Sequence, residues 1–200
     1  MKTSHGVAIA ALACALLAGP AAAETGAIAG FVSKVDVDDE VAGQDDGTGF
    51  GVRGWFGFGG PFAHFEYQAV TLDDSDTDVN ELRLGGGMSG QLNKQFEAFG
   101  KAEYVDLGSD IELDGFGVHG GVRMMPSPQF QLAASVGYLM LGGEVDDASG
   151  LEFDLNATFK FNRQFGGFFG YRSWMGSFDD AGTDFEVSDL RAGAVIFFGR

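Results

Sequence analysis

Alternation of apolar and polar side chains with a period of two recurs in ten segments of this chain, and it constrains the fold more than any other feature. The first segment spans about 27–37, and the last ends at Phe198. Such alternation is typical of β-strands that have one apolar and one polar face. Short turn segments precede four phenylalanines spaced by 34, 34 and 35 residues, namely Phe62, Phe96, Phe130 and Phe165. This internal repeat predicts a series of antiparallel hairpins.

Alternate residues of each segment form two sets, or phases, that point to opposite faces of the strand. Every lysine and arginine in these segments falls on the same phase, opposite to the phenylalanine-rich phase. These cations are Lys34, Arg53, Arg83, Lys101, Arg123, Lys160, Arg172 and Arg191. Glycines such as Gly85 and Gly121 share their phase, where they would leave room in a narrow lumen for long charged side chains. We therefore expect the charged face to point inward. The apolar face, which includes Ala29, Phe31 and Val35 in the first segment, would then point outward.

Aromatic residues on the apolar phase are spaced as a membrane would require. Phe96 and Tyr104, like Phe130 and Tyr138, lie eight residues apart, which is about 26 Å along a strand. In a strand tilted by about 40° this becomes roughly 20 Å along the membrane normal, close to the apolar band of about 25 Å in outer-membrane barrels. A soluble barrel with an apolar interior would not predict that fixed separation. The pattern favours an all-β fold, a closed antiparallel up-and-down transmembrane β-barrel of ten strands.

The first 23 residues predict a secretory signal peptide that precedes a single barrel domain at 24–200. Lys2 is followed by an apolar run at 7–17 and by three alanines at 21–23, which fit a small-residue cleavage site. The run is shorter than the roughly 20 residues of a membrane-spanning helix. The one cysteine, Cys14, lies within this leader, and 11–13 is a poor lipobox for a lipoprotein. The mature chain would therefore contain neither disulfides nor cysteine metal ligands.

The last segment resembles the C-terminal β-signal of bacterial outer-membrane proteins. The matching residues are Arg191, Gly193, Ile196 and Phe198, and Gly199 and Arg200 extend beyond the final aromatic residue that usually ends the signal. Together with the leader and the alternation, the sequence resembles the small Gram-negative outer-membrane β-barrels, of the OmpA-like transmembrane type without a periplasmic domain. The resemblance implies localisation in the outer membrane and insertion by the barrel assembly machinery.

Negative charge concentrates between the hairpins. The segments 38–47, 73–80, 106–114, 143–150 and 177–184 hold 19 of the 29 acidic residues and no lysine or arginine. An even number of strands places both termini on the periplasmic side, so these segments are expected to be the longer, extracellular loops, opposite short periplasmic turns. Carboxylates are ligands for Ca²⁺ and Mg²⁺, so lipid and lipopolysaccharide are candidate partners through divalent cations. Asp74, Asp76 and Asp78 are the tightest cluster, although a solvated acidic loop is the more common explanation. No nucleic-acid partner is expected.

A lumen network is the candidate site. Its predicted members are Lys34, Arg53, His64, Glu66, Arg83, Glu97, Lys101, Glu103, His119, Arg123, Glu152, Asp154, Lys160, Arg172, Asp189 and Arg191. His64 and His119 lie on segments that are not neighbours, and no Ser-His-acid set is apparent, so we predict no catalytic residue, metal ligand or cofactor. Glu66, next in phase to His64, is the expected partner of that histidine.

Two functions are compatible with these features. The first is a non-enzymatic outer-membrane protein with a structural or surface-interaction role, in which paired charges fill the lumen, because buried unpaired charge is very costly. The alternative is a narrow porin-like channel for small, cationic solutes. Loss of conductance on bulky substitution at Gly85 or Gly121 would indicate the channel.

Overall fold

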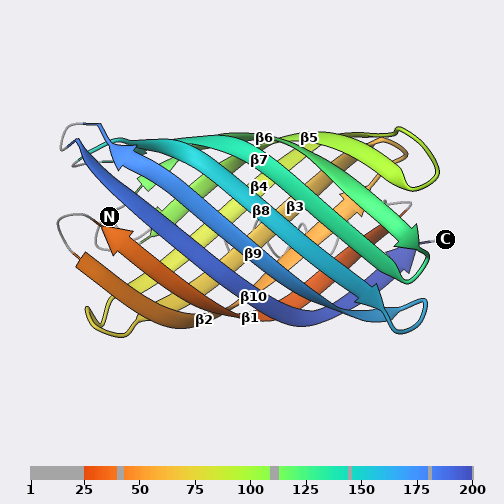
Figure 1. Ribbon diagram of the computed structural model, residues 1–200, viewed down its shortest axis with the longest axis horizontal. Coiled ribbons are helices and arrows are strands. Elements are labelled where there is room, and N and C mark those ends of the chain that lie inside the picture. Colours follow the sequence, from red (N-terminus) through yellow and green to blue (C-terminus); the bar gives the residue numbers. More distant parts are fainter. Residues whose placement is uncertain (1–24, 40–42, 109–112, 144–145, 180–181, 200) are drawn as a thin grey trace, which may run out of the picture.

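A computed structural model describes residues 25–39, 43–108, 113–143, 146–179 and 182–199 of the chain. The strands are β1 (Thr25–Asp39), β2 (Gly43–Gly57), β3 (Pro61–Leu72), β4 (Asp78–Gln91), β5 (Phe96–Gly108), β6 (Leu113–Ser127), β7 (Phe130–Gly143), β8 (Ala148–Lys160), β9 (Phe165–Phe178) and β10 (Thr183–Gly199). Each strand pairs with its sequence neighbours, and β10 pairs with β1 to close the barrel (Figure 1). The prediction of a closed antiparallel barrel of ten strands is confirmed. In these ranges no helix is long and apolar enough to cross a membrane.

The strands are staggered around the barrel. A path that follows the paired residues from Ala27 through all ten strands returns to β1 at Asp39, a stagger of 12 residues from position 27 to position 39. Such a stagger tilts the strands by about 40° from the barrel axis. Thr25 pairs with Gly199, so β1 starts and β10 ends at the same end of the barrel. We call this end periplasmic, following the rule for an even number of strands, and the opposite end extracellular.

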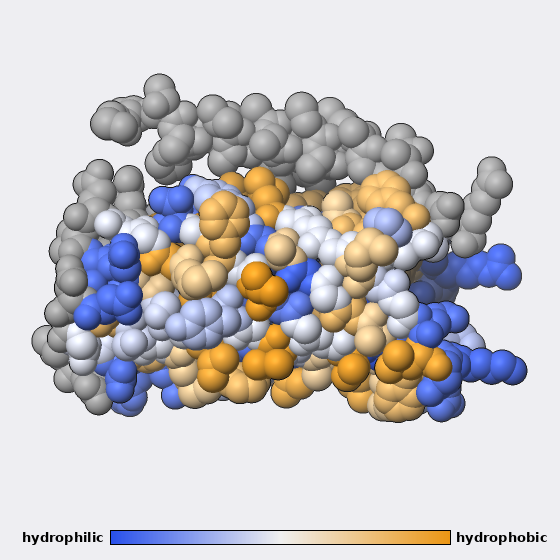
Figure 2. All heavy atoms as spheres, turned by 90° about the horizontal axis from the view of Figure 1, so that it is seen from above, coloured by the Kyte–Doolittle hydropathy of each residue, from blue (hydrophilic) through white to orange (hydrophobic). Residues whose placement is uncertain are grey.

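The outer wall carries an apolar belt. Phe50, Phe116 and Val118 are exposed over 66%, 63% and 59% of their surface, and Figure 2 shows apolar side chains along the wall with hydrophilic ones at both ends. Exposed apolar area of this extent in a ten-strand barrel fits contact with lipid. The hydroxyls of Tyr104 and Tyr138 each donate a hydrogen bond of 3.2 Å, to Asp114 and Ser149, at the extracellular edge of the belt. The predicted signal peptide at 1–23 lies outside the described residues.

In strand β1 the side chains that were predicted to face outward face the lumen instead. Ala29, Phe31 and Val35 are buried inside the barrel, and Phe31 packs edge-on against Phe168 with ring centroids 6.0 Å apart. The prediction placed these three side chains outside because it assigned the charged phase to the lumen. Apolar residues occur on both phases of β1, so its alternation is weak, and Gly51, opposite Phe31 on β2, provides the inward space that the ring occupies.

Lys34 is therefore not a lumen residue, and this prediction is wrong. It pairs with Leu190, an exposed residue of the outer wall, and its own side chain is 55% exposed. Its ammonium lies 3.2 Å from a carboxylate oxygen of Asp46 and 3.7 Å from one of Asp36. Both partners are on the outer face towards the extracellular end, so this cluster lies at the rim rather than in the lumen.

The strands extend into the acidic segments. β1 continues to Asp39, β2 begins at Gly43, and β4 begins at Asp78, all within ranges that the sequence analysis assigned to loops. The connections at the extracellular end are correspondingly shorter than expected. Many acidic side chains thus lie on strand ends that continue beyond the apolar belt.

Glycines in the lumen wall make room for a histidine. A methyl group placed on Gly117 would lie 2.9 Å from Nε2 of His119, and one placed on Gly137 would overlap the imidazole ring. Gly137 of β7 is the direct partner of His119 of β6, and Gly117 lies two residues before His119 on the same face of β6. The buried imidazole therefore depends on the missing side chains.

We predict that Gly137→Ala lowers the free energy of unfolding by about 1–3 kcal/mol, the usual cost of overpacking. Gly120→Ala is the matched control, because a methyl group there meets no atom within 4 Å, and we expect a change within about 0.5 kcal/mol. Urea unfolding of the barrel in detergent micelles measures both. Equal effects of the two substitutions would contradict the close approach of His119.

Candidate functional site

The extracellular half of the lumen is filled by an apolar plug. Its buried members are Val105, Leu113, Leu139, Leu141, Ala148, Trp174 and Phe185. Trp174 of β9 and Phe185 of β10 pack edge-to-face with ring centroids 4.6 Å apart, and Leu139 is 1% exposed. The plug was not predicted, because the sequence analysis assigned the inward phase to charged and small side chains. Nothing in the alternation distinguishes an apolar residue that faces the lumen from one that faces lipid.

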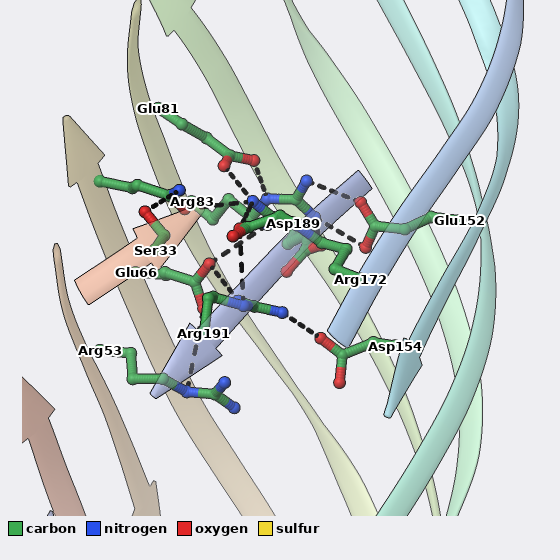
Figure 3. Close-up of polar contacts among 12 residues, drawn as sticks. Ser33, Arg53, Glu66, Glu81, Arg83, Glu152, Asp154, Arg172, Asp189 and Arg191 are labelled. Carbon is green, nitrogen blue, oxygen red and sulfur yellow. Dashed lines mark hydrogen bonds and ion pairs between the residues drawn. The ribbon is translucent and has the colours of Figure 1, made fainter. Parts of the chain in front are cut away.

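A charge network lies on the periplasmic side of the plug, and Arg83 of β4 is one of its centres. Its guanidinium donates to Glu103 of β5 at 3.0 Å and to both carboxylate oxygens of Glu152 of β8 at 2.9 and 2.6 Å (Figure 3). Arg83 also contacts Glu81 on its own strand. All four side chains are buried. One arginine thus connects three strands across the lumen.

Arg172 and Arg191 extend the network to the other walls. Arg172 of β9 contacts Glu81 of β4, which lies on the opposite side of the closed barrel, and its Nη1 lies 3.2 Å from Glu66 of β3. Arg191 of β10 donates to Glu66 at 2.9 Å and to Asp154 of β8 at 2.8 Å. Asp189 lies 3.3 Å from Arg172 and 3.5 Å from Arg191. Charge-assisted contacts therefore link opposite sides of the barrel.

Both histidines contact one glutamate. Nε2 of His64 lies 3.2 Å from Glu103, and Nε2 of His119 lies 2.8 Å from the other oxygen of the same carboxylate. Lys101 donates to Glu103 as well, at 2.7 Å. The expectation that Glu66 is the partner of His64 is wrong, because Glu66 is bound by Arg172 and Arg191. The histidines meet although β3 and β6 are not neighbours, because Glu103 of the intervening β5 reaches both.

Glu103, His119 and Glu152 also place three ligand atoms within 4.8 Å of one another, a geometry that could hold a metal ion. In this structure the guanidinium of Arg83 bonds to both carboxylates. A divalent cation at this point would have to displace that arginine, and its charge would be close to the arginine side chain. The residues therefore fit a site whose positive charge is supplied by Arg83, and they fit a metal poorly.

Arg53, Arg123 and Lys160, three cations of the predicted network, lie nearer the periplasmic end, and only Arg53 is connected to the central contacts. Arg53 donates to the side-chain oxygen of Asn156 at 3.0 Å. Arg123 lies 3.0 Å from Glu97, and the ammonium of Lys160 lies 4.6 Å from the ring centroid of Phe197. The structure brings together Arg53, His64, Glu66, Arg83, Lys101, Glu103, His119, Glu152, Asp154, Arg172, Asp189 and Arg191 in connected contacts, with Glu97, Arg123 and Lys160 apart from them.

The sequence analysis missed Glu81, Gln68 and Ser33. Glu81 contacts two arginines, and the amide of Gln68 donates to Ser33 at 3.0 Å inside the barrel. Glu81 lies two residues before Arg83 on the inward phase, so extending that strand by one alternation would have found it. Ser33 was missed because the phase of β1 was assigned wrongly.

The four residues of the predicted assembly signal divide between the two faces of β10. Arg191 is buried in the network, and a methyl group on Gly193 would overlap the backbone of β1. Ile196 is 53% exposed on the outer wall, and Phe198 packs against Phe56 with ring centroids 5.6 Å apart. Recognition of these residues by the assembly machinery remains a prediction.

At the extracellular rim, Asp45 connects two hairpins. Its carboxylate accepts hydrogen bonds from the backbone N–H groups of Asp74 and Ser75 at 3.0 and 3.1 Å. The bond from Asp74 is the main reason why the pKa of Asp45, which lies outside the membrane, is lower than usual. The side chains of Asp74, Asp76 and Asp78 do not form a group that could hold a metal ion within the described part of the chain.

Comparisons with known proteins support the fold. No family model and no curated protein sequence matches the chain. Among solved structures, an outer-membrane channel from Pseudomonas putida F1 superposes over 88% of this chain and 96% of its own, with a TM-score of 0.59 and 8% identity. The outer-membrane protease OmpT from Escherichia coli covers 87% of this chain and 95% of its own, with a TM-score of 0.48 and 9% identity. The attachment invasion locus protein Ail of Yersinia pestis covers 88% and 99%, with a TM-score of 0.42 and 13% identity.

At such low identity, similarity concerns the fold alone, and the superposition on the channel is the one that supports it. The closed ten-strand barrel, its apolar outer belt and its charged interior define an outer-membrane β-barrel protein. The predicted localisation in the bacterial outer membrane agrees with this fold.

We predict that Arg172→Met destabilises the barrel by about 3–5 kcal/mol. The substitution removes one of the positively charged partners of the buried carboxylates of Glu66, Glu81 and Asp189. Lys34→Met makes the same kind of change at an exposed rim pair and should cost less than about 1 kcal/mol. Urea unfolding in detergent micelles compares them. Similar costs would show that the lumen contacts contribute no more than surface pairs.

We further predict that Asp45→Asn speeds hydrogen exchange at the amides of Asp74 and Ser75. A carboxylate with a lowered pKa stabilises the fold at pH above its unfolded value, near 3.8, and this contribution disappears as the pH falls through the folded pKa. The same amides of the unsubstituted protein should therefore lose protection in acid, after correction for intrinsic exchange. Asp73→Asn is the control, and protection that is unchanged in Asp45→Asn would contradict the link.

Proposed function

We propose that this chain is a non-enzymatic outer-membrane barrel with a structural or surface-interaction role, whose lumen does not conduct. The observation that carries the proposal is the combination of two layers across the lumen. The apolar plug fills the extracellular half, and the arginine and carboxylate network connects opposite walls below it. An ion would have to enter an apolar layer and then separate buried charge pairs, both of which are costly.

Surface contacts would then involve the extracellular rim. The strand ends there carry acidic residues such as Asp38, Asp45 and Asp46, which are exposed or partly exposed. Lipopolysaccharide is anionic, so we propose contact through shared divalent cations, since carboxylates and phosphates are both oxygen ligands for such ions. Outer-membrane lipid around the belt and the barrel assembly machinery during insertion complete the proposed partners.

A narrow channel is the alternative function. The outer-membrane channel that superposes on this chain shows only that a barrel of this fold is compatible with such a role. Selectivity for cations is disfavoured by Arg83, Arg172 and Arg191, which would lie along the path. The proposed blocking test at Gly85 is also unsuitable, because a methyl group there would lie 2.5 Å from His64 and 2.7 Å from Glu103. A bulky residue would disrupt the wall instead of narrowing an open pore.

A non-enzymatic role agrees with the positions of the histidines. The side chain of His119 is 1% exposed, and both imidazoles contact Glu103 rather than a serine or threonine hydroxyl. A nucleophile activated by histidine needs that hydroxyl within hydrogen-bonding distance. We therefore propose that the histidines belong to the network.

The decisive test is conductance in planar lipid bilayers, for which we expect no steady openings from the purified protein. A wide porin measured under the same conditions serves as the positive control. Steady openings would contradict the proposal if Glu81→Gln or Arg172→Gln changed their amplitude or selectivity, because the current would then pass through the network. Openings that neither substitution changes would arise from leaks around the barrel, and the lumen would still count as closed.

A further inference from the structure

The periplasmic half of the lumen contains a cavity of about 950 Å³. Its inner end is formed by members of the network, including Glu66, Arg83 and Glu103. Its outer end reaches Gln129 and Asn162 in the periplasmic turns. The cavity is therefore a pocket that opens at the periplasmic end and ends at the network. Its volume is at the upper end of the range for small-molecule sites, about 300–1,000 Å³.

The pocket is basic, although the whole chain has a net charge of −17. Its lining includes Arg53, Lys101, Arg123, Lys160 and Arg163. The carboxylates that also line it, Glu66, Glu103, Glu152 and Asp154, are bonded to the arginines and to Lys101 of the network. The positive charge that remains is nearer the mouth of the pocket.

Lys160 is a partly buried cation of the lining without a carboxylate partner within the described residues. Arg163, in contrast, is exposed in its turn. The ammonium of Lys160 lies over the ring of Phe197. A cation–π contact of this kind is weaker than a pair with a carboxylate and leaves donors of the ammonium available. Arg123 has Glu97 as a partner, but its guanidinium also lies 5.4 Å from the ring centroids of both Trp55 and Phe99.

Aromatic and small apolar side chains form much of the remaining wall. Trp55 and Phe62 have ring centroids 6.4 Å apart, and Phe62 lies at the same distance from Phe99. On the other side, Phe168 and Phe197 belong to an apolar cluster with Ala27, Ala29, Phe31 and Val195. Apolar walls with a few convergent polar groups are typical of sites for small amphipathic molecules.

We propose that this pocket binds a water-soluble amphipathic anion, a carboxylate carried on an aromatic or short alkyl body. Lys160 holds the carboxylate, and the rings of Trp55, Phe62 and Phe99 on the other side of the pocket contact the apolar body. Phosphate-sized or strongly hydrated anions without an apolar part would lack the second set of contacts. A cationic ligand would meet the uncompensated lysine.

The ligand enters from the periplasm. All ten strands are paired with both neighbours, so the described wall provides no lateral gap towards the membrane. The apolar plug separates the pocket from the extracellular end. A soluble carboxylate can reach the mouth directly, whereas a phospholipid would have to leave the bilayer. We therefore assign the site to a soluble ligand and make lipid competition an outcome of the test.

Trp55 provides a direct readout. The chain has two tryptophans, and Trp174 lies in the plug, so Trp174→Phe leaves Trp55 in the pocket as the reporter. The experiment uses this variant of the protein, purified from outer membranes and placed in nanodiscs of zwitterionic lipid. 4-Phenylbutanoate is titrated while the emission of Trp55 is recorded, and 4-phenylbutan-1-ol is the neutral probe of the same shape. Resistance of the unheated protein to SDS verifies folding of each variant.

We expect a saturable change with 4-phenylbutanoate and at least tenfold weaker binding of the alcohol. Lys160→Gln should weaken binding of the carboxylate about tenfold, the scale of one charge-assisted contact. Lys94→Gln is the matched control, because it removes a cation from an exposed periplasmic turn that does not line the pocket, and it should leave the affinity unchanged.

Three results would overturn the proposal. These are the absence of a saturable response in folded protein, equal binding of the alcohol, and equal weakening by Lys94→Gln and Lys160→Gln, which would indicate general attraction to positive charge. Competition by anionic phosphatidylglycerol added to the nanodiscs would replace the soluble ligand with a lipid and contradict the assignment. None of these results bears on conductance, so the binding proposal and the closed lumen fail independently.

Discussion

The closure of β1 on β10 is the constraint from which the rest of this structure follows. In hydrocarbon an unpaired backbone amide costs several kcal/mol, and closure gives every strand two partners. A closed wall in lipid requires one apolar face, and the alternating backbone then points every second side chain into a narrow interior. Because ten strands enclose little space, the inward residues must fit one another. Glycines opposite His119 and Phe31 are the consequence, and so are the carboxylates of Glu103 and Glu66, which each contact at least two cations.

The outward-facing residues of the wall were predictable from sequence, because lipid requires apolar side chains on the outer face of each strand, whatever its neighbours are. In β2 to β10 the exposed apolar residues occupy alternate positions, so counting those positions identifies the outer face. β1 failed because Ser33 and Val35 face inward while Val32 and Lys34 face outward, so that both phases mix apolar and polar side chains. Its phase is determined by register with β10, where Val35 lies opposite Asp189. Alternation within one strand contains no information about that register.

The interior was predictable in composition but not in contacts. Inward charges could be named, whereas the partners of each depend on stagger and tilt, which bring Arg172 to Glu81 across the barrel and both histidines to Glu103. The apolar plug could not be inferred at all. Leu139 and Trp174 have the same hydropathy whether they face lipid or one another, and the decision is made by neighbours from six strands. Long-range geometry thus determines the candidate site more than local pattern does.

The apolar plug, the charge network and the basic pocket follow one another along the axis. The two ends of the barrel therefore have opposite electrostatic character. Acidic strand ends surround the extracellular rim, and the lysines and arginines are concentrated in the lumen and towards the periplasmic end. The plug and the network lie between these two regions, and the carboxylates of the network are paired with its arginines. Acidic and basic regions of this kind favour cations and anions, respectively. A closed lumen is therefore compatible with two separate binding surfaces, since neither requires passage through the barrel.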